Sequence, residues 1–159
     1  MQNTVFTVTG KDGVSFDARI CVPEGEPRGT VIFLKGSGAM TYLTKIEKKG
    51  VGIVSYHDAL ASLFAGKNIA YVSYSTRGVT DSDDPPDFHD IDDDLYKTYT
   101  PQSSVEDVLC LIDRIKIMLP GKPILLLGGS EGTVIAPLVA LRCPDVTGLL
   151  LFGYVNENL

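Results

Sequence analysis

The sequence is poor in cysteine and histidine and has no excess of positive charge. Its 159 residues include three cysteines and two histidines, and 14 Lys or Arg against 20 Asp or Glu give a net charge of −6. Nucleic acids and anionic membranes attract basic patches, so this balance argues against both as partners. Cys21, Cys110 and Cys143 form no Cys-x-x-Cys pair and have apolar neighbours. We expect small buried side chains in a reducing compartment rather than redox or metal sites.

Long hydrophobic runs are absent as well. No apolar run in the sequence reaches the ~18 residues that a membrane-spanning helix requires. Residues 1–5 have neither the basic region nor the apolar core of a secretory signal, so we expect a cytoplasmic protein. The length and the hydrophobic content of 44% predict one globular domain with a substantial core.

Predicted strands and helices alternate along the chain. Residues 4–22 alternate in polarity around a glycine-rich turn, which predicts an antiparallel hairpin. Continuous apolar runs predict buried strands at 30–35, 69–74, 124–127 and 147–152, and helical spacing predicts helices at 58–65, 103–119 and 133–142. This order predicts an α/β fold with a doubly wound, mostly parallel sheet covered on both faces.

Two local signals refine the predicted helices. Ser103-x-x-Glu106 has the form of a capping box, which predicts that the second helix starts at Ser103. Pro137 falls inside the third helix, where it is expected to bend the helix or remove one backbone hydrogen bond.

The most informative stretch is Gly128-Gly129-Ser130-Glu131-Gly132, between an apolar strand and an apolar helical pattern. This is the sequence form of a nucleophile elbow, a sharp turn that projects a serine above the sheet. It makes Ser130 the candidate nucleophile, and the backbone N–H of Glu131 a donor to the oxyanion that forms when serine attacks a carbonyl. The alternative is that the motif is only a tight glycine turn.

A second oxyanion donor is expected from the glycine-rich loop at 35–38, after the first buried strand. Glycines allow successive backbone N–H groups to face one point. The amide of Ser37 is the first candidate and the amide of Gly36 is the alternative.

These segments resemble the α/β-hydrolase superfamily, in particular its esterases and serine aminopeptidase-like hydrolases. Residues 128–140 resemble their elbow (G-H-S-E-G-G-x-I-A-P), residues 34–38 their H-G-S-G loop, and residues 74–79 their D-x-R-G-x-G segment. The chain departs from the pattern at four positions, with Lys35 and Gly129 in place of histidine, Ser75 in place of aspartate and Thr133 in place of glycine.

The resemblance implies an α/β-hydrolase-type fold and acyl transfer from a small ester or amide to water, with no metal or organic cofactor. In this family the catalytic acid and histidine follow strands beyond the one at 147–152. We therefore expect residues 1–159 to be the N-terminal portion of one such domain, truncated after about the sixth strand. The alternatives are a split or self-associated assembly completed at the 147–152 strand edge, and a non-catalytic remnant that binds a partner through this edge.

Other polar residues are weaker candidates. His57 is expected as a surface or cap residue and His89 as part of an acidic loop at 81–94, and neither is favoured as a base. The spacing of the acidic residues in that loop does not match an EF-hand calcium loop. We expect the loop to be solvated, and the alternative is a weak selection of cationic substrates. Glu157 or Asn156 could occupy an alternative position for the catalytic acid, although a frayed terminus is the favoured interpretation.

Overall fold

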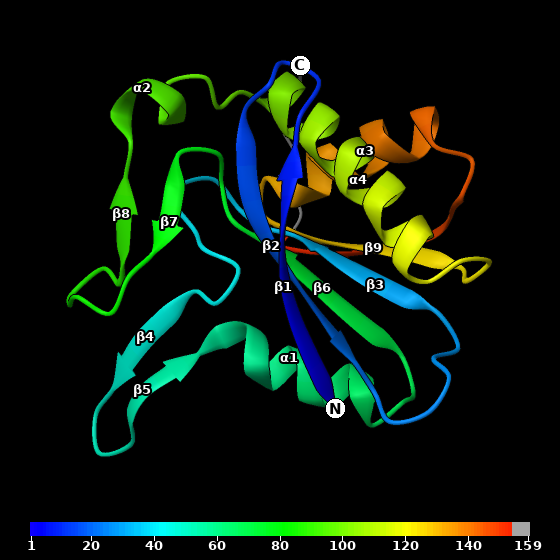
Figure 1. Ribbon diagram of the computed structural model, residues 1–159, viewed down its shortest axis with the longest axis horizontal. Helices are drawn as coiled ribbons and strands as arrows, with labels where there is room; N and C mark the ends of the chain where they lie inside the picture. Colours follow the sequence, from blue (N-terminus) through cyan, green and yellow to red (C-terminus); the bar gives the residue numbers. More distant parts are fainter. Residues whose placement is uncertain (154–159) are drawn as a thin grey trace.

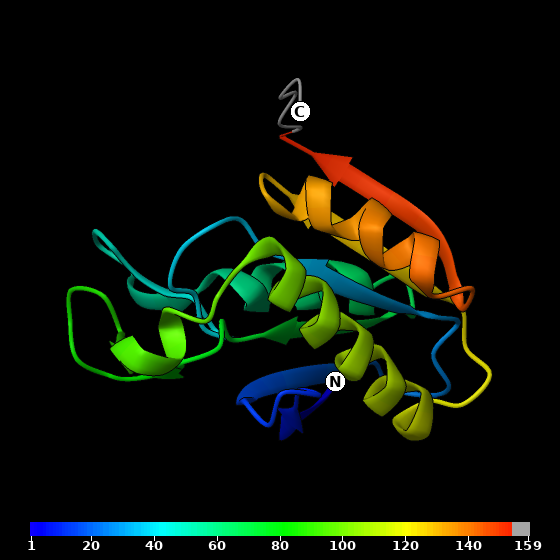
Figure 2. The same ribbon diagram turned by 90° about the horizontal axis from the view of Figure 1, so that it is seen from above.

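The computed structural model describes residues 1–153, which form an α/β fold around one six-stranded sheet (Figure 1). Its strands are β1 (Gln2–Thr9), β2 (Ser15–Val22), β3 (Thr30–Leu34), β6 (Ala70–Tyr74), β9 (Ile124–Gly129) and β10 (Val146–Phe152). They lie in the order β1-β2-β6-β3-β9-β10, with β1 and β10 at opposite ends of the sheet (Figure 2). The pairs β1–β2 and β2–β6 are antiparallel and the other pairs are parallel, as the predicted fold class requires.

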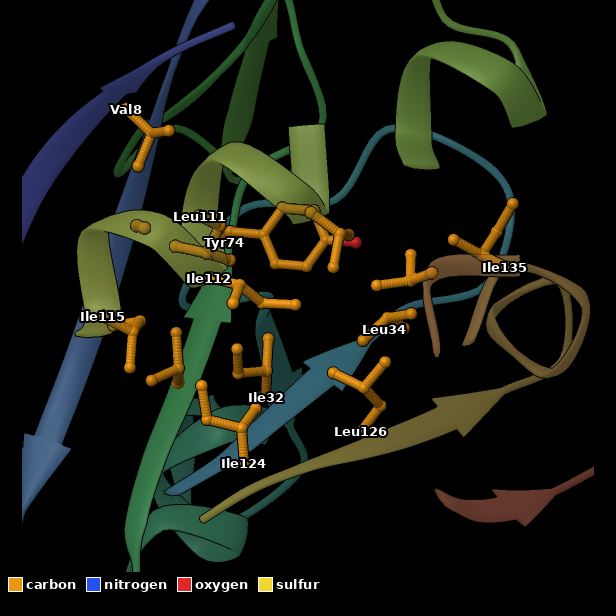
Figure 3. Close-up of a cluster of buried hydrophobic side chains, with 14 of the residues drawn as sticks. Val8, Ile32, Leu34, Tyr74, Leu111, Ile112, Ile115, Ile124, Leu126 and Ile135 are labelled. Carbon is orange, nitrogen blue, oxygen red and sulfur yellow. The ribbon is translucent and has the colours of Figure 1, made fainter. Parts of the chain in front are cut away.

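Helices cover both faces of this sheet. The helices α3 (Pro101–Met118) and α4 (Gly132–Arg142) pack on one face, over a cluster that includes Ile32, Leu34 and Tyr74 (Figure 3). The helix α1 (Tyr56–Ala65) packs on the other face, against the cluster of Val31, Phe33 and Tyr71. Successive residues of β3 therefore enter opposite cores, and all five are buried. This is why β3 appears in the sequence as a continuous apolar run.

Two small hairpins project from the sheet on the side away from α3 and α4 (Figure 1). One pairs β4 (Lys45–Lys48) with β5 (Gly52–Ser55), and the other pairs β7 (Val79–Asp81) with β8 (His89–Ile91). The first hairpin is missing from the sequence prediction because its short strands are mostly exposed and carry no alternation of burial. The second hairpin and α2 (Asp93–Tyr96) occupy the acidic segment that was expected to be a loop.

The helix α3 starts earlier than its sequence predicts. Thr100 is the N-cap, and its hydroxyl accepts a hydrogen bond from the Ser103 amide at 3.0 Å. The Ser103 hydroxyl accepts from the Thr100 amide at 2.8 Å, so Ser103 is the last residue of the capping box (position N3) instead of its first. The predicted start at Ser103 is wrong because Pro101, which lacks an N–H, suits the first helical position. Pro137 lies inside α4.

The cysteines are free thiols in two kinds of environment. Cys21 and Cys143 are buried, as predicted, and Cys110 is half-buried on α3. Among residues 1–153, no helix is both long enough and apolar enough to cross a membrane.

Candidate active site

Ser130 occupies the turn between β9 and α4, with its side chain exposed. Its φ of 51° lies in the left-handed region, which costs about 1–3 kcal/mol for a residue with a side chain. The turn is closed by direct backbone approach at two glycines. A Cβ atom at Gly132 would lie 2.1 Å from the Leu34 carbonyl oxygen, and one at Gly128 would lie 2.4 Å from the Gly132 carbonyl oxygen. Neither position accepts a side chain, so tight packing holds the strained serine in place.

Hydrogen bonds fix the Ser130 backbone on both sides. Its carbonyl accepts from the Thr133 amide at 2.8 Å and from the Thr133 hydroxyl at 2.6 Å. Its amide donates to the Phe152 carbonyl at 3.3 Å. The Thr133 hydroxyl supplies a bond that a glycine at this position would lack.

The strand order places the loop at 35–38 beside Ser130. β3 is the parallel neighbour of β9, with Leu34 opposite Gly128, so both strands end at the same edge of the sheet. A Cβ atom at Gly36 would lie 3.3 Å from Ser130 Cβ and 3.7 Å from Ser130 Oγ. Gly36 therefore faces the serine side chain, with little space for a side chain of its own between them. Ser37, the next residue, is exposed.

Glu131 occupies the N-cap position of α4 and has helical φ and ψ angles of −52° and −34°. Amides in the first turn of a helix have no partner in a preceding turn, and the helix dipole favours negative charge beside them. The Glu131 side chain points elsewhere, because its carboxylate accepts a 2.5 Å hydrogen bond from the Tyr99 hydroxyl.

A cavity of ≈ 260 Å³ opens beside Ser130. We call Gly36, Gly129 and Ser130 its serine wall, and Met40, Thr44 and Ile46 its hairpin wall; Phe33, Tyr56 and Phe152 complete the lining. The Phe33 and Phe152 rings stack with centroids 6.2 Å apart, so most of the surface offered to a ligand is apolar. Sequence reasoning missed the hairpin wall because its residues carry no motif.

His57 is not the surface or cap residue that its sequence position suggests. It lies in the first turn of α1, but its side chain is 1% exposed because that turn packs against Phe33 and Tyr71. Its Nδ1 lies 2.7 Å from the Tyr71 hydroxyl and its Nε2 lies 3.3 Å from the Thr44 hydroxyl. Burial lowers the pKa of His57 to about 3, and the positive charges of Arg19 and Lys35 add to this effect. The ring is therefore neutral.

His89 lies apart from the serine. It is half-buried in β8, with Nδ1 2.8 Å from the Asp87 carbonyl oxygen. Neither histidine is among the residues that line the Ser130 cavity. The two candidates for the acid position, Asn156 and Glu157, lie outside the described residues.

The acidic segment has structural contacts of its own. The Lys45 ammonium donates to Asp81 at 2.6 Å and to Asp83 at 2.7 Å, which ties β4 to the end of β7. The Asp92 carboxylate accepts from two amides at the start of α2. In the part of the chain that the structure describes, no group of three or more His, Cys, Asp or Glu side chains is placed to hold a metal ion.

No model of a known protein family matches this sequence, and no curated protein matches it. Solved structures do. A thermostable carboxyl esterase from Bacillus coagulans is 18% identical with a TM-score of 0.69, over 95% of this chain and 44% of its own. An α/β hydrolase from Penicillium is 14% identical with a TM-score of 0.69, over 95% of this chain and 45% of its own.

A cold-adapted esterase from an Arctic intertidal metagenomic library is 20% identical with a TM-score of 0.61, over 94% of this chain and 59% of its own. This chain has the α/β-hydrolase fold. It spans about half the length of these three structures. Nearly all of this chain, with its own six-stranded sheet, takes part in the match. At such identities the comparison concerns the α/β-hydrolase fold and not the reaction.

Proposed function

We propose that this chain is the nucleophile-bearing part of a serine hydrolase that cleaves carboxylic esters. Ser130 Oγ attacks the ester carbonyl while its proton passes to a base, and a tetrahedral oxyanion forms. The bond to the alcohol then breaks, and the departing alcohol takes the proton from the base. Water attacks the acyl-enzyme in the same way, which releases the carboxylic acid and restores the serine.

The observation that carries this proposal is the strained conformation of Ser130 at a strand-to-helix turn, with the serine side chain against Gly36. A positive φ at a non-glycine residue is costly, and such strain is concentrated at active sites. The turn combines this strain with an exposed hydroxyl at the mouth of an apolar cavity.

The oxyanion donors in this proposal are the backbone amides of Glu131 and Ser37, with the amide of Gly36 as the alternative to Ser37. The Glu131 amide lies at the start of α4. The Ser37 amide belongs to the residue after Gly36, which faces the Ser130 side chain. Loss of one such donor typically raises the barrier by about 2.7–4 kcal/mol.

The proposed substrates are small esters with an apolar acyl or alcohol group. A cavity of ≈ 260 Å³ with Phe33, Ile46 and Phe152 in its lining suits a short hydrocarbon group, and it offers few polar atoms that would bind a peptide. No metal or organic cofactor takes part in the proposed reaction.

The proposed base and acid come from a complementing segment that pairs with β10. This strand is at the end of the sheet, and its residues from Leu149 to Phe152 are 37–48% exposed. An apolar edge strand with unpaired backbone groups is a template for another strand. Such a strand would lie beside Phe152, whose carbonyl accepts from the Ser130 amide.

A fluorophosphonate probe tests the nucleophile. We expect it to label the folded chain at Ser130, with mass spectrometry locating the adduct, and we expect Ser130→Ala to remove the label. Ser62→Ala is the matched control, because it removes an exposed hydroxyl on α1 from a residue that does not line the Ser130 cavity. No labelling of a folded sample, with or without a complementing segment, would contradict the proposal.

The second candidate is a non-catalytic protein that binds a partner through the β10 edge. The exposed row from Leu149 to Phe152 favours it, because these side chains leave apolar surface in water. A folded sample that associates through this edge but takes no probe at Ser130 would support this candidate. Leu150→Lys, on the exposed strand, would then abolish the association without unfolding the chain.

A further inference from the structure

Lys35 is the first residue of the loop at 35–38, and its side chain points into the protein. The residue is only 5% exposed, and its ammonium lies 3.5 Å from the centre of the Tyr74 ring. Tyr74 belongs to the main core cluster, beside residues of α3 (Figure 3). A buried cation over an aromatic face is stabilised by the ring quadrupole, and this attraction is strongest where water is excluded.

Two carboxylates act on this ammonium from different helices. Asp107 of α3 and Glu131 at the start of α4 both favour the charged form of Lys35. Each carboxylate is held by another partner. Asp107 accepts two bonds from Arg77, at 3.0 and 2.6 Å, and Glu131 accepts from the Tyr99 hydroxyl. Lys35 therefore experiences their charge without displacing their hydrogen bonds.

The other titratable neighbours add little that would hold a proton on Lys35. Tyr74 of β6 and Tyr99, before α3, are neutral phenols, because burial raises the pKa of each well above its ordinary value. His57 of α1 is neutral, and Lys35 itself contributes to lowering its pKa. Burial lowers the pKa of Lys35 to about 7, because the attraction of the two carboxylates only partly offsets the loss of water.

The backbone around Lys35 lies close to both sides of the serine turn. A Cβ atom at Gly132 would lie 3.0 Å from the Lys35 carbonyl oxygen, and one at Gly36 would lie 3.3 Å from Ser130 Cβ. The Glu131 carboxylate, which attracts the ammonium, belongs to the residue after Ser130. Movement of the Lys35 side chain therefore acts on the backbone that carries Gly36 and Ser37 and on the backbone that carries Glu131.

We propose that Lys35 is a positioning residue: its buried ammonium, over the Tyr74 ring and attracted by Asp107 and Glu131, holds the loop at 35–38 in register with the Ser130 turn. The charged form fixes the loop, and the neutral form releases it because the attraction to the ring and the carboxylates is lost. Lys35 does not line the Ser130 cavity, so it acts on the serine through the two loops and not as a base.

The first test does not depend on catalysis. In a pH titration followed by NMR from pH 5.5 to 9, we expect the backbone amide signals of Gly36, Ser37 and Glu131 to shift with one midpoint near pH 7. Lys35→Met, which keeps an unbranched apolar stem, removes this transition. In Lys35→Arg the charge persists over the whole range, so the amides stay at their low-pH positions. A wild-type titration in which these three amides show no common transition would overturn the proposal, even if Lys35→Met did not fold.

The second test rests on the proposed function, and uses the rate of Ser130 labelling by a fluorophosphonate. We compare the wild-type rate with the Lys35→Met rate as a ratio. The titration of a catalytic base changes both rates equally, so it cancels in this ratio. We expect a ratio of about ten at pH 6, which declines toward one by pH 9, and Lys35→Arg restores most of the lost rate. A ratio that is independent of pH would mean that the lysine fills space only. If the wild type takes no label at all, the proposed function fails, and the amide titration still decides the role of Lys35.

Discussion

The two walls of the Ser130 cavity are held in different ways. The serine wall is held by close approach of the backbone: a Cβ atom at Gly36 would press on Ser130, and one at Gly132, in the turn that carries this wall, would overlap the Leu34 carbonyl oxygen. The hairpin wall is held by side chains. The Thr44 hydroxyl donates to the Thr41 carbonyl at 2.8 Å, and the Lys45 ammonium binds Asp81 and Asp83. A wall built from backbone contacts fixes a reacting atom, whereas one built from side chains can change with the ligand.

Two buried basic residues next to these walls also differ, in how their charge responds to pH. Lys35 lies behind the serine wall, within the attraction of Asp107 and Glu131. His57 lies behind the hairpin wall, where Arg19 and Lys35 oppose its protonation. The charge of Lys35 is therefore sensitive to pH near neutrality, whereas His57 stays neutral down to acidic pH.

The largest expected effect is on the turn that carries the serine wall. Gly132→Ala places a methyl group against the Leu34 carbonyl oxygen, so β3 and α4 must separate. We expect a loss of at least about 3 kcal/mol in the free energy of unfolding, measured with urea. Gly66→Ala is the matched control, because its Cβ would meet only ordinary contacts at 3.5 Å and its φ is −62°. Equal stability of the two variants would show that the serine turn is not closed by backbone approach.

The next effect concerns the hairpin wall and pH. His57 is neutral in the folded state down to about pH 3, whereas an unfolded histidine binds a proton below about pH 6.5. The unfolded state therefore gains protons first, and stability is lost as the pH falls from about 6.5 toward 3. We expect His57→Gln to reduce the loss of unfolding free energy between pH 7 and pH 4 by on the order of 2 kcal/mol. If the free energy of unfolding of His57→Gln had the same pH dependence as that of the wild type, the His57 ring would have to be hydrated.

A smaller effect separates strain from function at Ser130. Ser130→Gly relieves a positive φ, so we expect the free energy of unfolding to increase by about 0.5–1 kcal/mol and the thermal unfolding midpoint to rise. Fluorophosphonate labelling should disappear with the hydroxyl. Ser130→Ala is the control, since it removes the hydroxyl and keeps the strained backbone. A Ser130→Gly variant less stable than Ser130→Ala would contradict the presence of strain.

The smallest effect on stability is expected in the hairpin wall. Ile46 lines the cavity and is 49% exposed, so Ile46→Asp should change the free energy of unfolding by less than about 0.5 kcal/mol. Affinity for hexanoate, followed by NMR, should fall about fivefold because apolar contact is lost. Ile117→Asp, on the exposed face of α3, should leave that affinity unchanged. Equal affinity in both variants would exclude Ile46 from the binding surface.

Local signals predicted the sheet and the serine turn well. β3 and β9 are continuous apolar runs because both faces of the sheet are covered, and a strand that ends in a glycine turn must meet the loop of its neighbour. The β4–β5 hairpin gave no such signal, because its strands are exposed and its attachment depends on Asp81 and Asp83. His57 was misjudged for a related reason: its position in the first turn of α1 was evident, but the packing of that turn on Phe33 was not.

Residues adjacent in the chain were enough to predict the succession of strands and helices along it, the turn at Ser130 and the glycine loop at 35–38. What surrounds these features depends on the tertiary packing. It placed Lys35 over Tyr74, His57 against Tyr71, and Ile46 opposite Ser130 across a cavity. These contacts join residues far apart in the chain, so they depend on how the sheet and its helices pack.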